Sequence, residues 1–235
     1  MHATLHLVFK ILKWPVALIA LIGLPGIAVT CWGRLAASFT QDYMPFWAGV
    51  SAMLIIWGLL LRKAKWIQFL TTIEHEALHA IVGFISFIPI RELKVNEDGS
   101  GHVVFTPPTN WLMLLAPYFI PLTLAIYAAI VFALELEPRI EAAVLGAIFG
   151  LEWAGNVREI HPKQTDFRQA GWVFTVVFLP SAILLSYGAA ITMLLESGVG
   201  PGWAFFKAGI MGMIQDTLSF IQWGAEWMQN LLRAQ

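Results

Sequence analysis

Charged residues are scarce in this chain. Asp, Glu, Lys and Arg together make up 12% of its 235 residues, and hydrophobic types make up 58%. Soluble domains carry about 25% charged and about 45–50% apolar residues, so an ordinary soluble domain is excluded and an integral membrane protein is predicted. The formal net charge is −1. The chain therefore lacks the basic excess that nucleic-acid binding requires, and no nucleic-acid partner is expected.

Cysteine is almost absent as well. The single residue, Cys31, excludes an intrachain disulfide and a cysteine metal cluster. It stands in an apolar run beside Trp32, which is typical of a small buried residue.

Long apolar runs are what the chain has instead. A helix needs about 20 apolar residues to cross a bilayer. The run at 141–157 is the weakest, because it is short and contains Glu152 and Asn156. Lys10 and Lys13 precede the apolar run from Trp14 to Trp32, which we interpret as a retained span and not as a cleaved signal peptide. The sequence predicts an all-α polytopic membrane protein with five or six transmembrane helices, at 12–32, 44–61, 66–88, 111–134, 141–157 and 172–195.

Two further segments have patterns of their own. Within 90–107, two β-prone runs flank an Asp98-Gly99 turn and predict a short β-hairpin. From Trp203 to Arg233, apolar and polar residues form opposite stripes of a helix, which is typical of an amphipathic helix at the membrane interface, or of one packed on the bundle or on a partner protein. We divide the chain into a transmembrane domain at 1–200 and a C-terminal amphipathic helix at 201–235.

The third apolar run contains the pattern H-E-x-x-H, from His75 through Glu76 to His79. Histidines four residues apart face the same side of a helix, close enough to bind one metal ion. The glutamate between them is placed to act as a general base toward water. Ionisable groups at membrane depth cost several kcal/mol by rough estimates, so they indicate a functional site.

A catalytic zinc site needs a third protein ligand and an open position. Asp166 is the favoured candidate, because it stands just before the last long run and a helix start there would direct it back toward the bundle. Glu152 and His161 remain as alternatives. His102 is expected to face outward from the hairpin.

Two more polar residues near the motif have open roles. Glu74 lies about 200° around the helix from Glu76, which favours a supporting group or a partner of a nearby cation over a catalyst. Asn156 is either a donor to a substrate carbonyl or a helix-end cap.

The residues Glu74 to Ala80 in a membrane span, followed by a hairpin from Leu93 to Val103, resemble the M50 family of intramembrane zinc metalloproteases, the site-2 protease group, and within it the compact M50B-like branch. The resemblance runs from about Trp66 to the span after Asp166. It implies a Zn²⁺ cofactor, His75 and His79 as ligands with a late aspartate as third, and Glu76 as the catalytic acid and base. The chain has neither the Asn-Pro-x-Asp-Gly nor the Leu-Asp-Gly pattern of the best-known members, and offers His161 to Phe167 instead.

The expected function is that of a membrane-embedded zinc metallopeptidase. It would hydrolyse peptide bonds in or beside transmembrane segments of membrane-protein substrates, as in regulated intramembrane proteolysis. The protein is expected to be a multi-pass protein of the lipid bilayer. The resemblance implies that this bilayer is a bacterial inner membrane. The alternative is a non-proteolytic membrane subunit whose structural or relic zinc site supports a larger complex, with a protein partner on the C-terminal helix. A metal or proton transporter is disfavoured, because its ionisable residues would lie on several spans.

Overall fold

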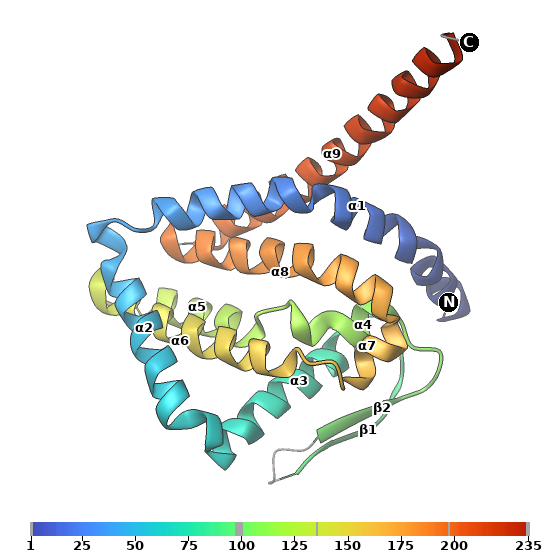
Figure 1. The fold of residues 1–235 in the computed structure, drawn as a ribbon. Helices are drawn as coiled ribbons and strands as arrows, with labels where there is room; N and C mark the ends of the chain where they lie inside the picture. The colour runs from blue at the N-terminus through green and yellow to red at the C-terminus, as the bar shows by residue number, and fades with distance from the viewer. Residues whose placement is uncertain (1, 97–100, 135, 197, 234–235) are drawn as a thin grey trace.

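The computed structural model describes residues 2–96, 101–134, 136–196 and 198–233, and the fold is almost entirely helical (Figure 1). Three short 3₁₀ turns, η1 (Gln41–Tyr43), η2 (Leu61–Lys63) and η3 (Ala116–Tyr118), join longer elements. These are α1 (His2–Ala37), α2 (Met44–Leu59), α3 (Lys65–Ile85), β1 (Ile90–Val95), β2 (Gly101–Phe105), α4 (Trp111–Leu115), α5 (Leu122–Ala133), α6 (Pro138–Glu159), α7 (Thr165–Ala170), α8 (Trp172–Leu195) and α9 (Val199–Arg233).

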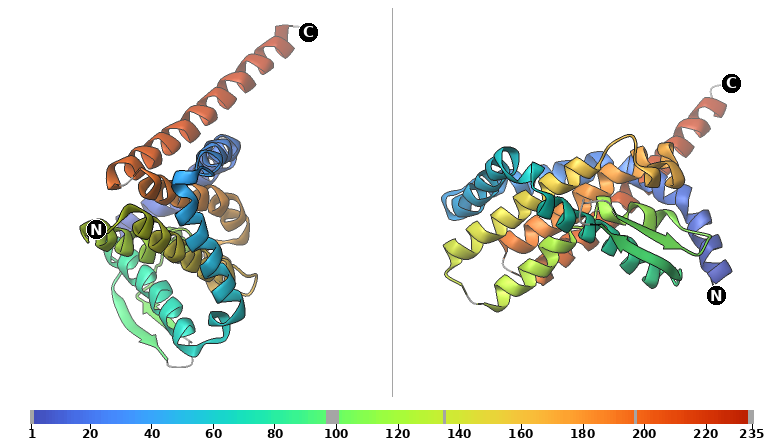
Figure 2. Two further views of the ribbon diagram at one scale, coloured as in Figure 1. Left: turned by 90° about the vertical axis from the view of Figure 1, so that its left-hand side faces the viewer. Right: turned by 90° about the horizontal axis from the view of Figure 1, so that it is seen from below.

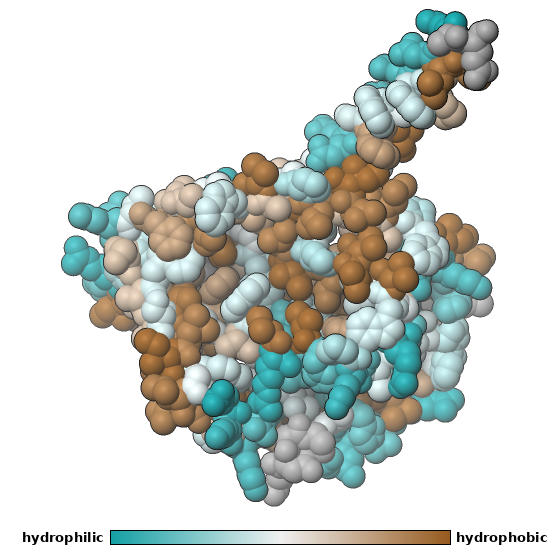
Figure 3. All heavy atoms as spheres, viewed as in Figure 1, coloured by the Kyte–Doolittle hydropathy of each residue, from teal (hydrophilic) through white to brown (hydrophobic). Residues whose placement is uncertain are grey.

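Three of the described helices are long and apolar enough to cross a membrane: α1 over His6–Ala37, α6 over Pro138–Glu159 and α8 over Trp172–Met193. Large apolar side chains also stand on the surface. Val29 is 72% exposed and Phe84 78%. Brown, hydrophobic residues cover much of the face drawn in Figure 3, while hydrophilic residues gather toward its lower end. Such a surface suits lipid better than water, and these features indicate a membrane protein.

The expected span at 111–134 is wrong as a single helix. The segment divides into α4, η3 and α5. Pro117 lies inside η3, and Pro121 comes directly before α5. Proline has no N–H to donate and disfavours helical geometry in the residue before it, so two prolines four residues apart break the helix. α2 is 16 residues long and α3 21.

Helices α2 and α6 cross at glycines. A Cβ added to Gly49 would overlap the carbonyl oxygen of Ala143, and one added to Gly146 would overlap that of Phe46. One added to Gly150 would lie 3.0 Å from the Val50 oxygen. The spacing Gly146-x-x-x-Gly150 places small residues on one face, as in close helix pairs within membranes. The weakest predicted span is thus a full-length helix that packs tightly.

Helix α8 is the centre of the packing. It contributes Phe174 and Phe178 to a cluster with α1, α4 and α7, Tyr187 to a cluster with α2, α5 and α6, and Leu185 to a cluster with α1 and α9. It lies between α1 and the α5–α6 layer in Figure 1. All three clusters of buried residues therefore share this one helix.

Helix α9 packs on the bundle along only half of its length. Phe205, Met213 and Thr217 are buried. Beyond Thr217 the helix projects away from the bundle (Figure 2), and Leu218 and Trp223 are 55% and 61% exposed. A helix with opposed apolar and polar stripes was expected here, and the structure has one, begun two residues before 201.

The two strands form an antiparallel hairpin in which Leu93 pairs with Val103. The expected turn at Asp98-Gly99 lies outside the described residues. The hairpin leaves α3 by a turn in which Ile88 N–H donates to the Gly83 carbonyl at 2.8 Å and Phe87 N–H to that of Phe84 at 2.9 Å. Phe87 has a φ of 57°, the left-handed conformation that usually ends a helix in this way. This turn folds the hairpin back along α3.

Candidate metal centre

The two histidines of the motif face one another across one turn of α3. Their Nε2 atoms are 3.2 Å apart. Asp166 of α7 approaches the same point, with Oδ2 at 3.7 Å from His75 Nε2 and 3.4 Å from His79 Nε2. The three side chains come from segments some 90 residues apart and are only 8–15% exposed.

The donor set fits a zinc ion. Zinc bound tetrahedrally at about 2.0–2.1 Å by nitrogen and oxygen has neighbouring ligand atoms about 3.3–3.4 Å apart. The triangle formed by the two Nε2 atoms and Oδ2 has sides of 3.2, 3.4 and 3.7 Å. Two imidazoles and one carboxylate also leave a fourth position for water or substrate. These residues can therefore hold one zinc ion without rearrangement of the backbone.

The ligand candidates are themselves held from outside. His79 Nδ1 is 2.9 Å from the Met113 carbonyl oxygen, so Nδ1 carries the proton and donates it to this carbonyl. The unprotonated Nε2 is then available to bind a metal ion. Tyr118 donates to Asp166 Oδ2 at 2.8 Å. Burial alone would raise the pKa of Asp166, but its interactions with His75 and His79 and the hydrogen bond from Tyr118 hold it well below its usual value. The aspartate is thus ionised, as a metal ligand must be.

Glu76 follows His75 in the sequence, and its side chain is buried. The titratable groups that interact with its carboxyl group are His79, His75, Asp166 and His102. Strand β2 lies directly against this turn of α3. A Cβ at Gly101 would stand 2.6 Å from Thr72 Cγ2 and 3.0 Å from Glu76 Cγ. Only glycine allows the strand so close, and the hairpin therefore borders the proposed base.

The other candidate ligands lie away from the metal group. Glu152 accepts a hydrogen bond from Leu124 N at 2.9 Å, and His161 is exposed and accepts one from Lys163 N at 3.1 Å. His102 is exposed beside Glu92, as expected for an outward-facing residue. The structure thus brings Asp166 to the two histidines, and its role as a ligand stays a prediction.

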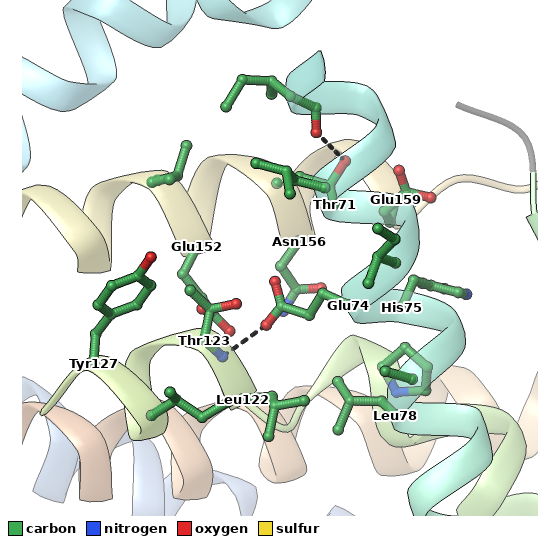
Figure 4. A pocket seen from close by; sticks show the side chains of 18 of the residues that line it. Thr71, Glu74, His75, Leu78, Leu122, Thr123, Tyr127, Glu152, Asn156 and Glu159 are labelled. Carbon is green, nitrogen blue, oxygen red and sulfur yellow. Dashed lines mark hydrogen bonds between the residues drawn. The ribbon is translucent and has the colours of Figure 1, made fainter. Parts of the chain in front are cut away.

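Among the described residues Glu74 has no cationic partner, which one of its two expected roles required. It accepts a hydrogen bond from Thr123 N at 2.8 Å, at the start of α5, and its carboxyl group lies beside that of Glu152 (Figure 4). Asn156 is not a helix-end cap either. Its Nδ2 donates to the Tyr118 carbonyl and to the Tyr187 hydroxyl, each at 2.9 Å, which leaves it little capacity to donate to a substrate.

Two supporting groups were missed at the sequence level: the Met113 carbonyl and the Tyr118 hydroxyl. A backbone carbonyl carries no sequence signal. Tyr118 is fully buried between Pro117 and Pro121, and a polar-tipped aromatic at a proline break inside an apolar run is the one sign that could have singled it out.

Cys31 is half-buried, and its Sγ lies 3.2 Å from the Leu184 carbonyl oxygen on α8. It sits far along the chain from the metal group and packs α1 against α8.

No family model, curated protein or solved structure matches the chain. The assignment of a function therefore depends on the chemistry of the site itself.

Proposed function

We propose that this chain is an intramembrane zinc metallopeptidase of the M50 type, which hydrolyses peptide bonds in or beside transmembrane segments of other membrane proteins. One observation carries the proposal: His75, His79 and Asp166 converge on one point with the spacing that zinc requires, and Glu76 is buried next to them. A purely structural zinc site would need no base and would have a fourth protein ligand.

The chemistry follows from these groups. A zinc ion, when bound, supplies Lewis-acid activation at the reacting centre. Glu76 accepts a proton from the attacking water as the water oxygen bonds to the peptide carbonyl carbon, and returns that proton to the amine nitrogen as the carbon–nitrogen bond breaks. Tyr118 and the Met113 carbonyl keep the ligands oriented.

The hairpin gives the substrate a place to bind. A transmembrane helix already satisfies its own backbone hydrogen bonds, so its peptide bonds must be exposed before they are cleaved. A strand edge can hold an unwound segment by β-addition. β1 is exposed along most of its length, and β2 touches the Glu76 turn. We therefore place the substrate path along Lys94-Val95 or Val103-Val104.

Replacing Val95 or Val104 with proline should lower cleavage about tenfold or more, because proline removes a backbone donor and bends the strand. Zinc content should stay unchanged. The checks are cleavage of a single-span substrate and zinc analysis of the same samples, with Val95→Ala as the matched control. Unchanged cleavage would refute this substrate path, whereas loss of zinc together with activity would mean that the variant has misfolded.

The metal assignment is tested by zinc analysis of purified protein. Wild type should carry roughly one zinc ion per chain, and Asp166→Ala or His79→Ala should lose most of it, since either change removes one of three protein ligands. His161→Ala and Glu152→Gln are the matched controls, because they change the two residues that lie outside the metal group, and both should keep their zinc. Zinc lost from His161→Ala instead would refute Asp166 as the ligand.

The same samples, tested on a panel of single-span substrates, decide between the proposal and the alternative. A peptidase cleaves at least one substrate and stops when zinc is removed by a chelator. A wild type that holds no zinc and cleaves nothing, while a larger assembly survives loss of the histidines, would establish the non-proteolytic subunit.

We further propose a multi-pass arrangement of five or six spans, in a bacterial inner membrane as the family resemblance suggests. Support comes from α1, α6 and α8, which are long enough to span alone, and from α2, which packs closely against α6. α4 and α5 would cross as a broken pair, since irregular backbone is tolerated at membrane depth where protein surrounds it.

A further inference from the structure

A pocket of about 380 Å³ opens beside the metal group, between α3, α5 and α6. His75 lies at its edge, so the pocket is adjacent to the reacting centre (Figure 4). Most of its wall is aliphatic, and includes Leu70, Ile73, Leu122, Ile126 and Leu151. A wall of this kind excludes a fully polar ligand and accepts a hydrocarbon chain.

Acceptor groups gather at the polar end of the pocket. Glu74 and Glu152 face each other there, each bound through one oxygen to a backbone N–H of α5. Asn156 Oδ1 is buried and, within the described part of the chain, has no hydrogen-bond partner. Glu159 also lines the pocket. A buried acceptor without a donor costs about 1–3 kcal/mol, so this group of acceptors calls for a ligand that brings donors.

The charge of the pocket has one sign. Its described lining residues include three glutamates and no lysine or arginine. Glu74 and Glu152 lie beside each other, which concentrates acidic groups at the polar end of the pocket (Figure 4). A single cation of the ligand would complement that charge.

We propose that this pocket is a specificity subsite that takes a lysine or arginine side chain of the substrate. The aliphatic stem would lie against the apolar wall and the cationic head would bind Glu74, Glu152 and Asn156 Oδ1. Long basic side chains bury their stems in this way while keeping the head bound. The subsite rests on the proposed peptidase function, and it predicts cleavage next to the basic residues that flank many transmembrane segments.

Binding is measured in Glu76→Gln protein, so that the result does not depend on cleavage. The probes are fluorescent Leu/Ala peptides of about 20 residues, with one guest position near the end occupied by Lys, Arg, Met or Gln. The Lys and Arg peptides should bind about tenfold more tightly than the Met peptide, as expected for one charge-assisted hydrogen-bonded contact.

Adding Glu152→Gln or Glu74→Gln should abolish this preference and leave Met-peptide binding unchanged, since the amide oxygen can still accept from α5. Glu226→Gln on the projecting part of α9 is the matched control and should retain the preference. Equal binding of the Lys and Met peptides, or a preference that survives both glutamine variants, would overturn the subsite. If wild type cleaves no peptide while the preference holds, the peptidase function fails and the subsite remains.

Discussion

Glu76→Gln should lower the rate of substrate cleavage by about a thousandfold or more while leaving roughly one zinc ion per chain. General acid–base catalysis contributes about 10²–10⁴ in rate, and the amide of glutamine neither accepts the proton of water nor returns one to the leaving amine. His75, His79 and Asp166 are untouched by the change, so the metal stays. The measurements are the cleavage rate of a single-span substrate and zinc analysis of the same preparation.

The control for this variant is Glu226→Gln, which makes the same chemical change at an exposed position of α9 and should cleave like wild type. Cleavage by Glu76→Gln within about threefold of the wild-type rate would contradict the role of Glu76, since no general base is that dispensable. Loss of zinc from the variant would instead show that the carboxylate holds the site together.

Gly146→Ala should destabilise the protein by about 3 kcal/mol, even though alanine favours a helix more than glycine does. The added Cβ would overlap the backbone carbonyl oxygen of Phe46. A backbone atom cannot turn aside as a side chain can, so α2 and α6 must separate along their contact. Thermal unfolding in detergent, followed by circular dichroism, measures the loss.

Gly58→Ala, on α2 itself, is the matched control. Nothing lies within 4 Å of a Cβ at that position, so only the gain in helix propensity remains, about 0.5–1 kcal/mol of stabilisation. The two alanines should therefore shift the melting temperature in opposite directions. Equal shifts would show that α2 and α6 do not cross at Gly146.

Much of the fold follows from the sequence, because apolar runs and prolines act locally. The runs that became α6 and α8 were predicted within three residues at each end, and so were the outer ends of the hairpin, whereas the run at 12–32 covers only the middle of α1. The segment 111–134 was predicted as one helix, whereas it is broken at Pro117 and Pro121. Whether a proline bends or ends a helix depends on the tertiary contacts that satisfy the freed carbonyls, and these are absent from a local pattern.

The candidate site was partly predictable for the same reason. His75 and His79 share a helix, so their spacing alone brings them together. Asp166 is some 90 residues away and was reached by argument from the start of the next helix, with Glu152 and His161 left open. The approach of Glu74 to Glu152 at the start of α5 could not be predicted, because it needs α3, α5 and α6 in their final arrangement.

Gly171 links the helix that carries Asp166 to the centre of the bundle. It is the only residue between α7, which carries Asp166, and α8, and its φ of 93° is a conformation that other residues rarely adopt. The aspartate therefore lies on a short helix that is separated by a single residue from the helix that all three buried clusters share. The two histidines lie on α3, which contributes one residue, Val82, to these clusters. Of the two sides of the metal group, Asp166 is therefore the one joined directly to the helix at the centre of the packing.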